Sequence, residues 1–332
     1  MAKNRVFRLK VRPQGEAKAS DFELREEPLE LLSKDQILVK VKYLSLDPTN
    51  RIWMSDMPQY MPPVEVGDVM RGLGIGMVEE SQSPNFKKGD LVSGLLGWQE
   101  YSKVEAASLS KLPQWDVPLD AHMGPLGMTG WTAYFGLLNI GQPKPGETVV
   151  VSAAAGAVGS IVGQIAKIQG CHVIGLAGSD EKCHWLKEEL GFDGVINYKK
   201  EHLGKALDRL CPKGIDVYFE NVGGEVLDMI LPRMNLFGRI PLCGLISSYN
   251  AEDKVPGPYQ FSQILMKRLK VQGFIVFDFA KDIPAATEQL GQWLKDGRIR
   301  YKSTIVKGLE KAPEAMNMLF KGENTGKLFI EL

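Results

Sequence analysis

A run of small residues between two apolar stretches is the part of this sequence best suited to binding a charged ligand. In VVVSAAAGAVGSIVGQIAKIQG, residues 149–170, three valines predict a buried strand, and the later apolar residues at helical spacing predict a helix. The AAAGAVG between them departs from the G-x-G-x-x-G pattern by carrying Ala154 at its first glycine position. Gly156 would let the backbone approach a pyrophosphate, and Gly159 would let the helix lie close to the strand. Because the N–H groups at the helix start would hold the phosphates, we interpret the turn as a dinucleotide site rather than a packing turn.

The residues after the next predicted strand indicate which nucleotide binds. An NAD site usually carries an acid about 20 residues further on, which binds the ribose 2′-hydroxyl. Here the sequence is LAGSDEK, in which Ser179 and Lys182 could bind a 2′-phosphate instead, and this favours NADPH. Two alternatives stay open: Ser179 could serve only as a helix N-cap, and Asp180 lies near enough to act as the NAD acid.

The sequence offers few ligands for a zinc ion. Zinc sites use Cys, His and acidic side chains, yet residues 1–120 contain neither cysteine nor histidine. No C-x-x-C pair occurs among the four cysteines, which are Cys171, Cys183, Cys211 and Cys243. We therefore expect no metal. Without a Lewis acid, the expected hydride acceptor is an activated carbon–carbon double bond, because hydrogen bonds can stabilise the developing enolate.

Two kinds of pattern along the chain must position these residues. The first third alternates apolar and polar residues, as in QILVKVKYLSLD, and FKKGDLVSGLLGWQEYSKV predicts two strands joined at a turn. From about residue 147, apolar strands alternate with amphipathic helices, which is typical of a parallel sheet covered on both faces. The predicted strands of this sheet are 147–153, 171–178, 194–198, 215–224, 238–247 and 269–277. Helices are predicted over 179–191 and 225–237.

The tail of the chain returns to strands, in YKSTIVKGL and GKLFIEL. We therefore predict an α/β protein in which a doubly wound parallel-sheet (Rossmann) domain, residues 125–302, is inserted into a β-barrel domain, residues 1–124 plus 303–332. The barrel domain would hold the substrate, and the Rossmann domain would hold the dinucleotide.

The overall composition argues against several classes of partner. Forty basic and forty acidic residues cancel, so no global field would attract nucleic acid or an anionic membrane. The start, MAKNRVFRLK, lacks the apolar segment of a secretory signal, and no stretch is apolar enough to span a membrane. Four cysteines do not form a disulfide framework, so we expect a cytoplasmic protein.

Several blocks of sequence, in order along nearly the whole chain, match one family. The chain resembles the zinc-independent medium-chain dehydrogenases/reductases, in the branch of prostaglandin reductases (leukotriene hydroxydehydrogenases), plant double-bond reductases and bacterial curcumin reductases. The matching blocks are SLDP at 45–48, GMTGWTAYFGLL at 127–138, AAAGAVGSIVGQIAK at 153–167, AGSDEK at 177–182, FENVGG at 219–224, CGLISSYN at 243–250, KRLKVQGFIVFD at 267–278 and GENTGK at 322–327.

The resemblance implies a GroES-like barrel domain, NADPH as cofactor and a set of residues around it. Pyrophosphate contacts are implied for Gly156, Ala157, Val158 and Gly159, and 2′-phosphate contacts for Lys182 and Tyr198. The positions implied beside the rest of the cofactor are Asn221, the run Cys243, Gly244, Leu245, Ile246, Ser247, Ser248 and Tyr249, the run Phe274, Ile275 and Val276, and Asn324. Taken alone, such residues are common in turns and cores. The resemblance also suggests a homodimer joined through the last sheet strand, around GFIVFD.

Two departures from the family affect the expected chemistry. The family often has Tyr after DP, where this chain has Thr49, and a family tyrosine before the basic residues of KRLKVQGF is replaced here by Met266. The hydroxyl that binds the substrate carbonyl must therefore come from elsewhere. Tyr249 and Tyr60 are our candidate catalytic donors, with the cofactor ribose and water as alternatives.

The function implied by the resemblance is NADPH-dependent reduction of the carbon–carbon double bond of α,β-unsaturated ketones and aldehydes. A quinone oxidoreductase that uses the same cofactor is an alternative. The replaced tyrosines also leave open a non-catalytic protein that binds NADPH as a structural ligand or sensor.

Overall fold

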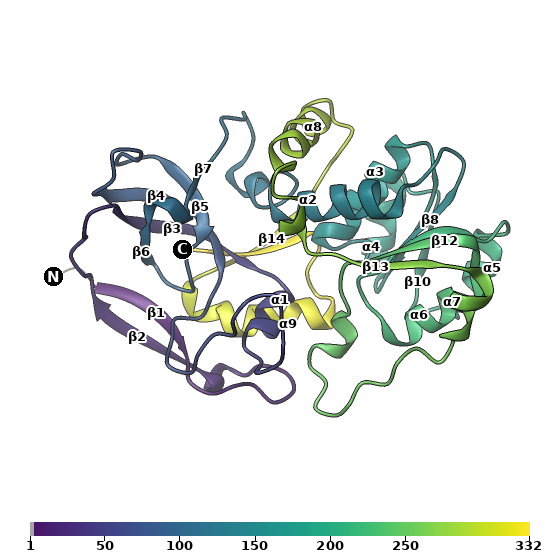
Figure 1. Ribbon diagram of the computed structural model, residues 1–332, viewed down its shortest axis with the longest axis horizontal. Helices are drawn as coiled ribbons and strands as arrows, with labels where there is room; N and C mark the ends of the chain where they lie inside the picture. Colours follow the sequence, from purple (N-terminus) through teal and green to yellow (C-terminus); the bar gives the residue numbers. More distant parts are fainter. Residues whose placement is uncertain (1–2) are drawn as a thin grey trace. The chain divides into compact units, whose positions relative to one another are not determined.

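A computed structural model describes residues 3–332 of the chain (Figure 1). The chain divides into two compact units. One, here called the barrel unit, consists of the chain up to Asp120 with Ser303–Asn324 and Leu328–Leu332. The other, here called the nucleotide unit, consists of Ala121–Lys302 with Thr325–Lys327.

The nucleotide unit is built on a six-stranded sheet whose order is β10-β9-β8-β11-β12-β13, with all neighbours parallel. This is the strand order of the doubly wound dinucleotide fold, so the predicted fold class is confirmed. The strands are β8 (Thr148–Val151), β9 (His172–Ala177), β10 (Gly194–Asn197), β11 (Ile215–Phe219), β12 (Met234–Leu242) and β13 (Lys270–Gly273). Strand β8 is buried along its whole length, as expected for a central parallel strand.

Helices cover both faces of this sheet, with α2 and α3 on one face and α5 and α6 on the other (Figure 1). The helices of the unit are α2 (Met128–Phe135), α3 (Ala157–Ile168), α4 (Asp180–His184), α5 (Leu203–Leu210), α6 (Gly224–Ile230), α7 (Ser262–Lys267) and α8 (Ile283–Lys295). Single π-helical turns extend α2 over Gly136–Gly141 and α4 over Trp185–Glu189.

The helix predicted over 225–237 is too long. Helix α6 ends at Ile230 and passes through a 3₁₀ turn, Leu231–Arg233, directly into strand β12 at Met234. Pro232 lies in that turn and has no N–H to continue the helical hydrogen bonds. Met234 then pairs with Ile215 of β11, so β12 begins four residues earlier than the 238–247 prediction.

The sheet of the barrel unit follows the order β14-β15-β3-β4-β5-β7, with β6 paired to β3, and its pairs from β15 to β7 and between β3 and β6 are antiparallel. The strands of this sheet are β3 (Gln36–Leu46), β4 (Leu73–Ser81), β5 (Leu91–Leu95), β6 (Tyr101–Glu105), β7 (Ser110–Lys111), β14 (Ser303–Lys307) and β15 (Lys327–Glu331). A separate hairpin joins β1 (Lys3–Leu9) to β2 (Phe22–Pro28), and helices α1 (Thr49–Trp53) and α9 (Ala312–Lys321) complete the unit. Strands β5 and β6, predicted as neighbours at a turn, pair with other strands instead.

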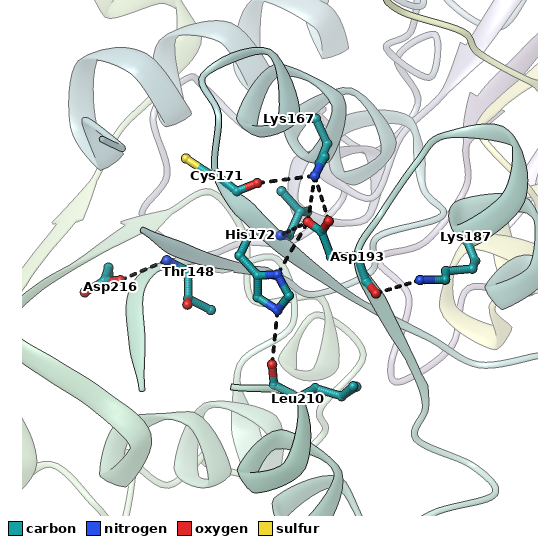
Figure 2. A network of polar contacts seen from close by, with 9 residues as sticks. Thr148, Lys167, Cys171, His172, Lys187, Asp193, Leu210 and Asp216 are labelled. Carbon is teal, nitrogen blue, oxygen red and sulfur yellow. Dashed lines mark hydrogen bonds and ion pairs between the residues drawn. The ribbon is translucent and has the colours of Figure 1, made fainter. Parts of the chain in front are cut away.

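A polar network stabilises the amino ends of β8 and β9 in the nucleotide unit (Figure 2). The Lys167 ammonium of α3 donates a 2.8 Å hydrogen bond to each oxygen of the Asp193 carboxylate. The Val173 backbone N–H donates a further one, at 2.7 Å. Burial raises the pKa of Asp193, but the Lys167 hydrogen bond, the Val173 N–H and the nearby charges outweigh it and lower the pKa overall. The network therefore holds the carboxyl end of α3 against the amino end of β9, whereas the glycine turn lies at the carboxyl end of β8.

Within residues 3–332, no helix combines the length and the apolar character needed to cross a membrane.

Candidate active site

The turn between β8 and α3 leaves no room for a side chain at Gly159. A Cβ there would lie 2.4 Å from the Ala153 carbonyl oxygen and 2.9 Å from the Ala154 Cα. Both contacts are with backbone, so a side chain could be accepted only if the helix moved away from the strand. Gly159 is therefore the residue that allows α3 to pack closely on the end of β8.

Gly156 differs from Gly159, because the surrounding protein atoms leave room for a side chain there. It is the N-cap residue of α3 with φ of −82°, and a Cβ would meet only the Ala153 oxygen, at 3.1 Å. The first-turn N–H groups of α3, from Ala157 to Gly159, have no carbonyl of their own helix to bind. A bare N-cap beside unsatisfied N–H groups, at the positive end of a 12-residue helix, fits a diphosphate.

The segment Thr325–Lys327 of the nucleotide unit, which follows Asn324 in the chain, is tied to this turn through Gly326. The Gly326 N–H donates to the Ala155 carbonyl at 2.8 Å, and Gly326 pairs with Gly156 as an isolated parallel bridge. A Cβ on Gly326 would lie 1.8 Å from the Lys302 carbonyl oxygen, so only glycine fits. Asn324 itself is buried.

Basic and hydroxyl groups gather where β9 and β10 end. A Cβ on Gly178 would lie 2.8 Å from the Tyr198 hydroxyl and 3.3 Å from the Lys199 Cε, so both side chains lie over this glycine. Burial lowers the pKa of Lys182, and the positive charge of Lys199 lowers it further. Burial raises the pKa of Tyr198, whose phenol therefore stays protonated. Two mutually repelling ammonium groups beside a phenol form a site suited to a doubly charged phosphate.

Ser179 and Asp180, at the same strand end, are both engaged by the protein. The Ser179 hydroxyl oxygen accepts the Lys182 N–H at 3.3 Å, as an N-cap, and the hydroxyl hydrogen-bonds to the Glu181 carboxylate. Asp180 accepts a 2.7 Å hydrogen bond from the Asn197 amide and forms an ion pair with Lys200. Hence the N-cap role of Ser179 is present, and Asp180, the acid considered for an NAD site, is already paired with a cation.

A pocket of about 400 Å³ lies at the carboxyl ends of β12 and β13. Ligands of doubly wound folds bind at this edge of the sheet. The pocket brings together two runs that are about 30 residues apart in the sequence, and the residues lining it are Leu242, Cys243, Gly244, Leu245, Tyr249, Gly273, Phe274, Ile275 and Asp278.

The Tyr249 side chain folds back onto the wall of this pocket. Its hydroxyl oxygen accepts the Leu245 backbone N–H at 3.0 Å, and a Cβ on Gly244 would lie 3.2 Å from the same oxygen. A phenol that accepts a backbone N–H is polarised, which makes its own O–H a stronger donor. Tyr249 can therefore present a fixed hydroxyl to the pocket.

A buried acid, Glu220, fixes the strand ends behind the pocket. One of its carboxyl oxygens accepts from the Val222 N–H at 2.7 Å, the Gly223 N–H at 3.0 Å and the Tyr218 hydroxyl at 2.9 Å. Its backbone carbonyl accepts from the N–H groups of Cys243 at 2.9 Å and Gly244 at 3.1 Å. Burial raises the pKa of Glu220, and burial, with the Glu220 charge adding to it, raises the pKa of Cys243 to about 12. The thiol in the pocket wall is therefore protonated at neutral pH.

Asn221 joins the ends of β8 and β11. Its backbone N–H donates to the Ser152 hydroxyl at 2.9 Å, and its side-chain amide donates to the Ser152 carbonyl at 2.8 Å. Its own carbonyl accepts the Ile246 N–H at 3.2 Å. The side chain predicted to lie beside the cofactor thus also organises the turn.

Other predicted residues lie near the pocket without lining it. Val276 is buried in an apolar cluster with Phe135 and Ala286, which is the core role weighed as an alternative. Ser247 donates from its hydroxyl to the Val222 carbonyl at 2.6 Å, and Ser248 donates to the Leu245 carbonyl at 2.8 Å.

Among the residues the structure describes, no group of three or more His, Cys, Asp or Glu side chains could hold a metal ion.

Comparison with known proteins places this geometry in a family. Residues 5–112 match the model described as the N-terminal domain of oxidoreductase, and residues 157–292 match the model described as zinc-binding dehydrogenase. The NADPH-dependent curcumin reductase of Escherichia coli is 45% identical, over 99% of this chain and 97% of its own length. The chain belongs to the medium-chain dehydrogenase/reductase family.

Two further relatives indicate the branch of the family. The 2-alkenal reductase (NADP(+)-dependent) of Nicotiana tabacum is 44% identical, over 98% of this chain and 96% of its own length. The crystal structure of CurA from Vibrio vulnificus in complex with NADPH is similar with a TM-score of 0.93, 42% identity and 98% coverage of both chains. These matches confirm the branch that the sequence blocks indicated.

The first departure from this family, at Thr49, has a visible consequence in the barrel unit. Thr49, where the family often has tyrosine, bonds through its hydroxyl to the hydroxyl of Tyr60, 11 residues along the chain. The Tyr60 oxygen also accepts the Trp53 indole N–H at 2.9 Å, and the Tyr60 side chain is 43% exposed. Met266, which replaces the second family tyrosine, is exposed on α7.

Sequence reasoning missed several residues of the site. Lys199 follows Tyr198, which was predicted to contact the 2′-phosphate. A lysine next to such a residue is itself a signal for phosphate binding. Asp278 stands inside the KRLKVQGFIVFD block but received no role. Glu220 carried no signal beyond its place before Asn221, because an acid in a turn is usually exposed.

Proposed function

We propose that this protein uses NADPH to reduce the carbon–carbon double bond of α,β-unsaturated ketones and aldehydes. The observation that carries the proposal is the pocket at the ends of β12 and β13, lined by Tyr249 and lying in the same unit as the glycine turn. The relatives named as curcumin and 2-alkenal reductases support the substrate class.

The nucleotide unit fits NADPH at three points. The bare N-cap at Gly156 and the first-turn N–H groups of Ala157, Val158 and Gly159 would hold the diphosphate. Lys182 and Tyr198, with Lys199, would hold the 2′-phosphate. The remaining cofactor contacts in the proposal are Asn221, the run from Cys243 to Tyr249 and the run Phe274 to Val276 of this unit, together with Asn324 of the barrel unit. NADPH, when bound, supplies a hydride for the substrate β-carbon.

The residues of the chain would then handle the charge on the substrate oxygen. As hydride reaches the β-carbon, negative charge builds up on the carbonyl oxygen, and a positioned O–H donor stabilises it. We propose Tyr249 for this donor, because its hydroxyl is held at the pocket wall by the Leu245 N–H. Tyr60, polarised by the Trp53 indole N–H, is the second candidate. Protonation of the α-carbon by tyrosine or solvent completes the reduction.

The domain assignment, the subunit arrangement and the location are part of the same proposal. Residues 125–302 would bind the nucleotide, and residues 1–124 with 303–332 would bind the substrate. Strand β13 is the edge of the parallel sheet, with Val271 exposed, so a second copy pairing along it would form a homodimer. All four cysteines are free thiols, which suits the cytoplasm.

The test is to mix the purified protein with NADPH and a panel of enones, alkenals and quinones, and to follow the loss of NADPH and the product formed. We expect saturated ketones and aldehydes from the enones and alkenals. Turnover of quinones alone would instead identify a quinone oxidoreductase. Binding of NADPH without turnover of any acceptor would identify a non-catalytic binding protein.

A further inference from the structure

Asp180 occupies the position where an acid decides between the two nicotinamide nucleotides. It follows the end of β9 by three residues and begins α4. A carboxylate in this region can bind the 2′-hydroxyl of NADH, and it would repel the 2′-phosphate of NADPH. In a protein that uses NADPH, the negative charge of this carboxylate must therefore be neutralised or held away from the 2′-phosphate.

Both oxygens of the Asp180 carboxylate have partners from the end of β10. One accepts the Asn197 side-chain amide at 2.7 Å, and the other forms an ion pair with Lys200. The Lys200 hydrogen bond, followed by that of Asn197, lowers the pKa of Asp180, so the group is fully ionised and its charge is compensated by the lysine.

Asn197 makes this arrangement rigid. The residue is buried, and its side-chain oxygen accepts the Lys199 N–H at 3.2 Å while its carbonyl accepts the Lys200 N–H at 2.9 Å. One amide group therefore orients the turn that carries both lysines and holds the Asp180 carboxylate against that turn. Such an exposed ion pair adds little to stability, so its effect is to be looked for in ligand binding.

We infer that Lys200, assisted by Asn197, acts on cofactor preference by neutralising and holding Asp180, so that the carboxylate neither repels a 2′-phosphate nor binds a 2′-hydroxyl. Lys200 is a specificity-determining residue that works through Asp180, whereas Lys182 and Lys199 face the phosphate. The inference rests on the proposed use of NADPH.

The test is a double-mutant cycle on the dissociation constants for NADPH and NADH, measured by calorimetry at low and high salt. Lys200→Ala should weaken NADPH binding about three- to tenfold at low ionic strength, leave NADH binding unchanged or stronger, and lose its effect at high salt. In the Asp180→Asn background the same substitution should change NADPH binding by less than about twofold. Lys200→Arg keeps the charge and should behave as wild type, and Lys295→Ala removes a distant charge as a control.

Three results would overturn the inference. Equal weakening of NADPH binding by Lys200→Ala with and without Asp180 would mean that the lysine binds the phosphate directly. Equal weakening of NADPH and NADH would mean a structural role. Unchanged binding in Lys200→Ala would mean no role. If the wild-type protein binds neither nucleotide, the proposed function fails together with the inference, whereas the three results above leave the proposed function intact.

Discussion

The two glycines of the β8–α3 turn should respond differently to the same substitution, Gly to Ala. A methyl at Gly159 would lie 2.4 Å from a backbone oxygen, so α3 must move, and we expect an overpacking cost near the upper end of about 1–3 kcal/mol. Better helix propensity returns about 1 kcal/mol, which leaves a net destabilisation of about 2 kcal/mol. For a unit of this size that lowers the melting temperature by about 4–8 °C.

A methyl at Gly156 meets only one atom, at 3.1 Å, in an ordinary backbone conformation, so Gly156→Ala should still fold, with about 0.5–1 kcal/mol lost because alanine is a poorer N-cap residue than glycine. It would, however, occupy the space proposed for the diphosphate. Losing one charge-assisted hydrogen bond costs about 1.5–3 kcal/mol, which weakens NADPH binding by about 10- to 150-fold.

The assay is thermal unfolding of the unliganded protein together with calorimetric titration of NADPH, for wild type and both variants. Gly257→Ala is the matched control, because a Cβ there meets nothing within 4 Å. A folded Gly156→Ala protein that binds NADPH as tightly as wild type would refute our interpretation of the turn. A Gly159→Ala protein as stable as wild type would refute the packing argument.

Three other predictions concern the donor, the phosphate site and the opposite edge of the sheet. Replacing the tyrosine that donates to the substrate oxygen with phenylalanine should lower kcat by about 10²-fold or more. Steady-state kinetics of Tyr249→Phe and Tyr60→Phe therefore identify the donor. A wild-type kcat in both variants would leave the cofactor ribose or water as the donor. Lys199→Ala should weaken NADPH binding about tenfold and NADH binding hardly at all, while Lys295→Ala changes neither; equal loss for both nucleotides would contradict a phosphate contact. Asp193→Asn should destabilise the protein by about 1–2 kcal/mol at neutral pH in urea unfolding. The pKa of Asp193 is lower in the folded state than in the unfolded state, so the carboxylate stabilises the fold above its unfolded-state pKa. This stabilisation is lost as the pH falls through the folded-state pKa, and the variant should then be as stable as wild type in strong acid. A stability difference that is the same at all pH values would exclude the ionic contribution.

The elements with strong local patterns could be predicted from the sequence. Three consecutive valines and a 3.6-residue apolar period predicted the places of β8 and α3, and all six strands of the parallel sheet overlap the predicted apolar runs, although β12 begins four residues early. The end of α6 was missed because 225–237 keeps a helical apolar pattern past Pro232, and only pairing with β11 makes Met234 a strand residue. Tertiary pairing overrode the local period there.

The candidate site was predictable where backbone shape creates it and unpredictable where distant side chains meet. The glycine turn can be read from spacing alone, since Gly159 has a local steric reason and Gly156 stands at the helix start where a diphosphate would bind. The Asp180–Lys200 pair joins residues that follow the ends of β9 and β10. Glu220 accepts hydrogen bonds from Ser152, just after β8, and from Tyr218 of β11, and such contacts depend on the folded sheet. The Thr49–Tyr60 hydroxyl pair likewise becomes visible only when the loop after α1 folds back.

The most direct test of the whole account is to follow deuterium from C4 of the NADPH nicotinamide ring, labelled on either face in turn, into the product formed from an enone. Mass spectrometry and NMR locate the label. The account predicts a saturated ketone that carries one deuterium at the former β-carbon. Deuterium at the carbonyl carbon of an allylic alcohol, or an enone recovered unlabelled after prolonged incubation with active protein, would contradict it.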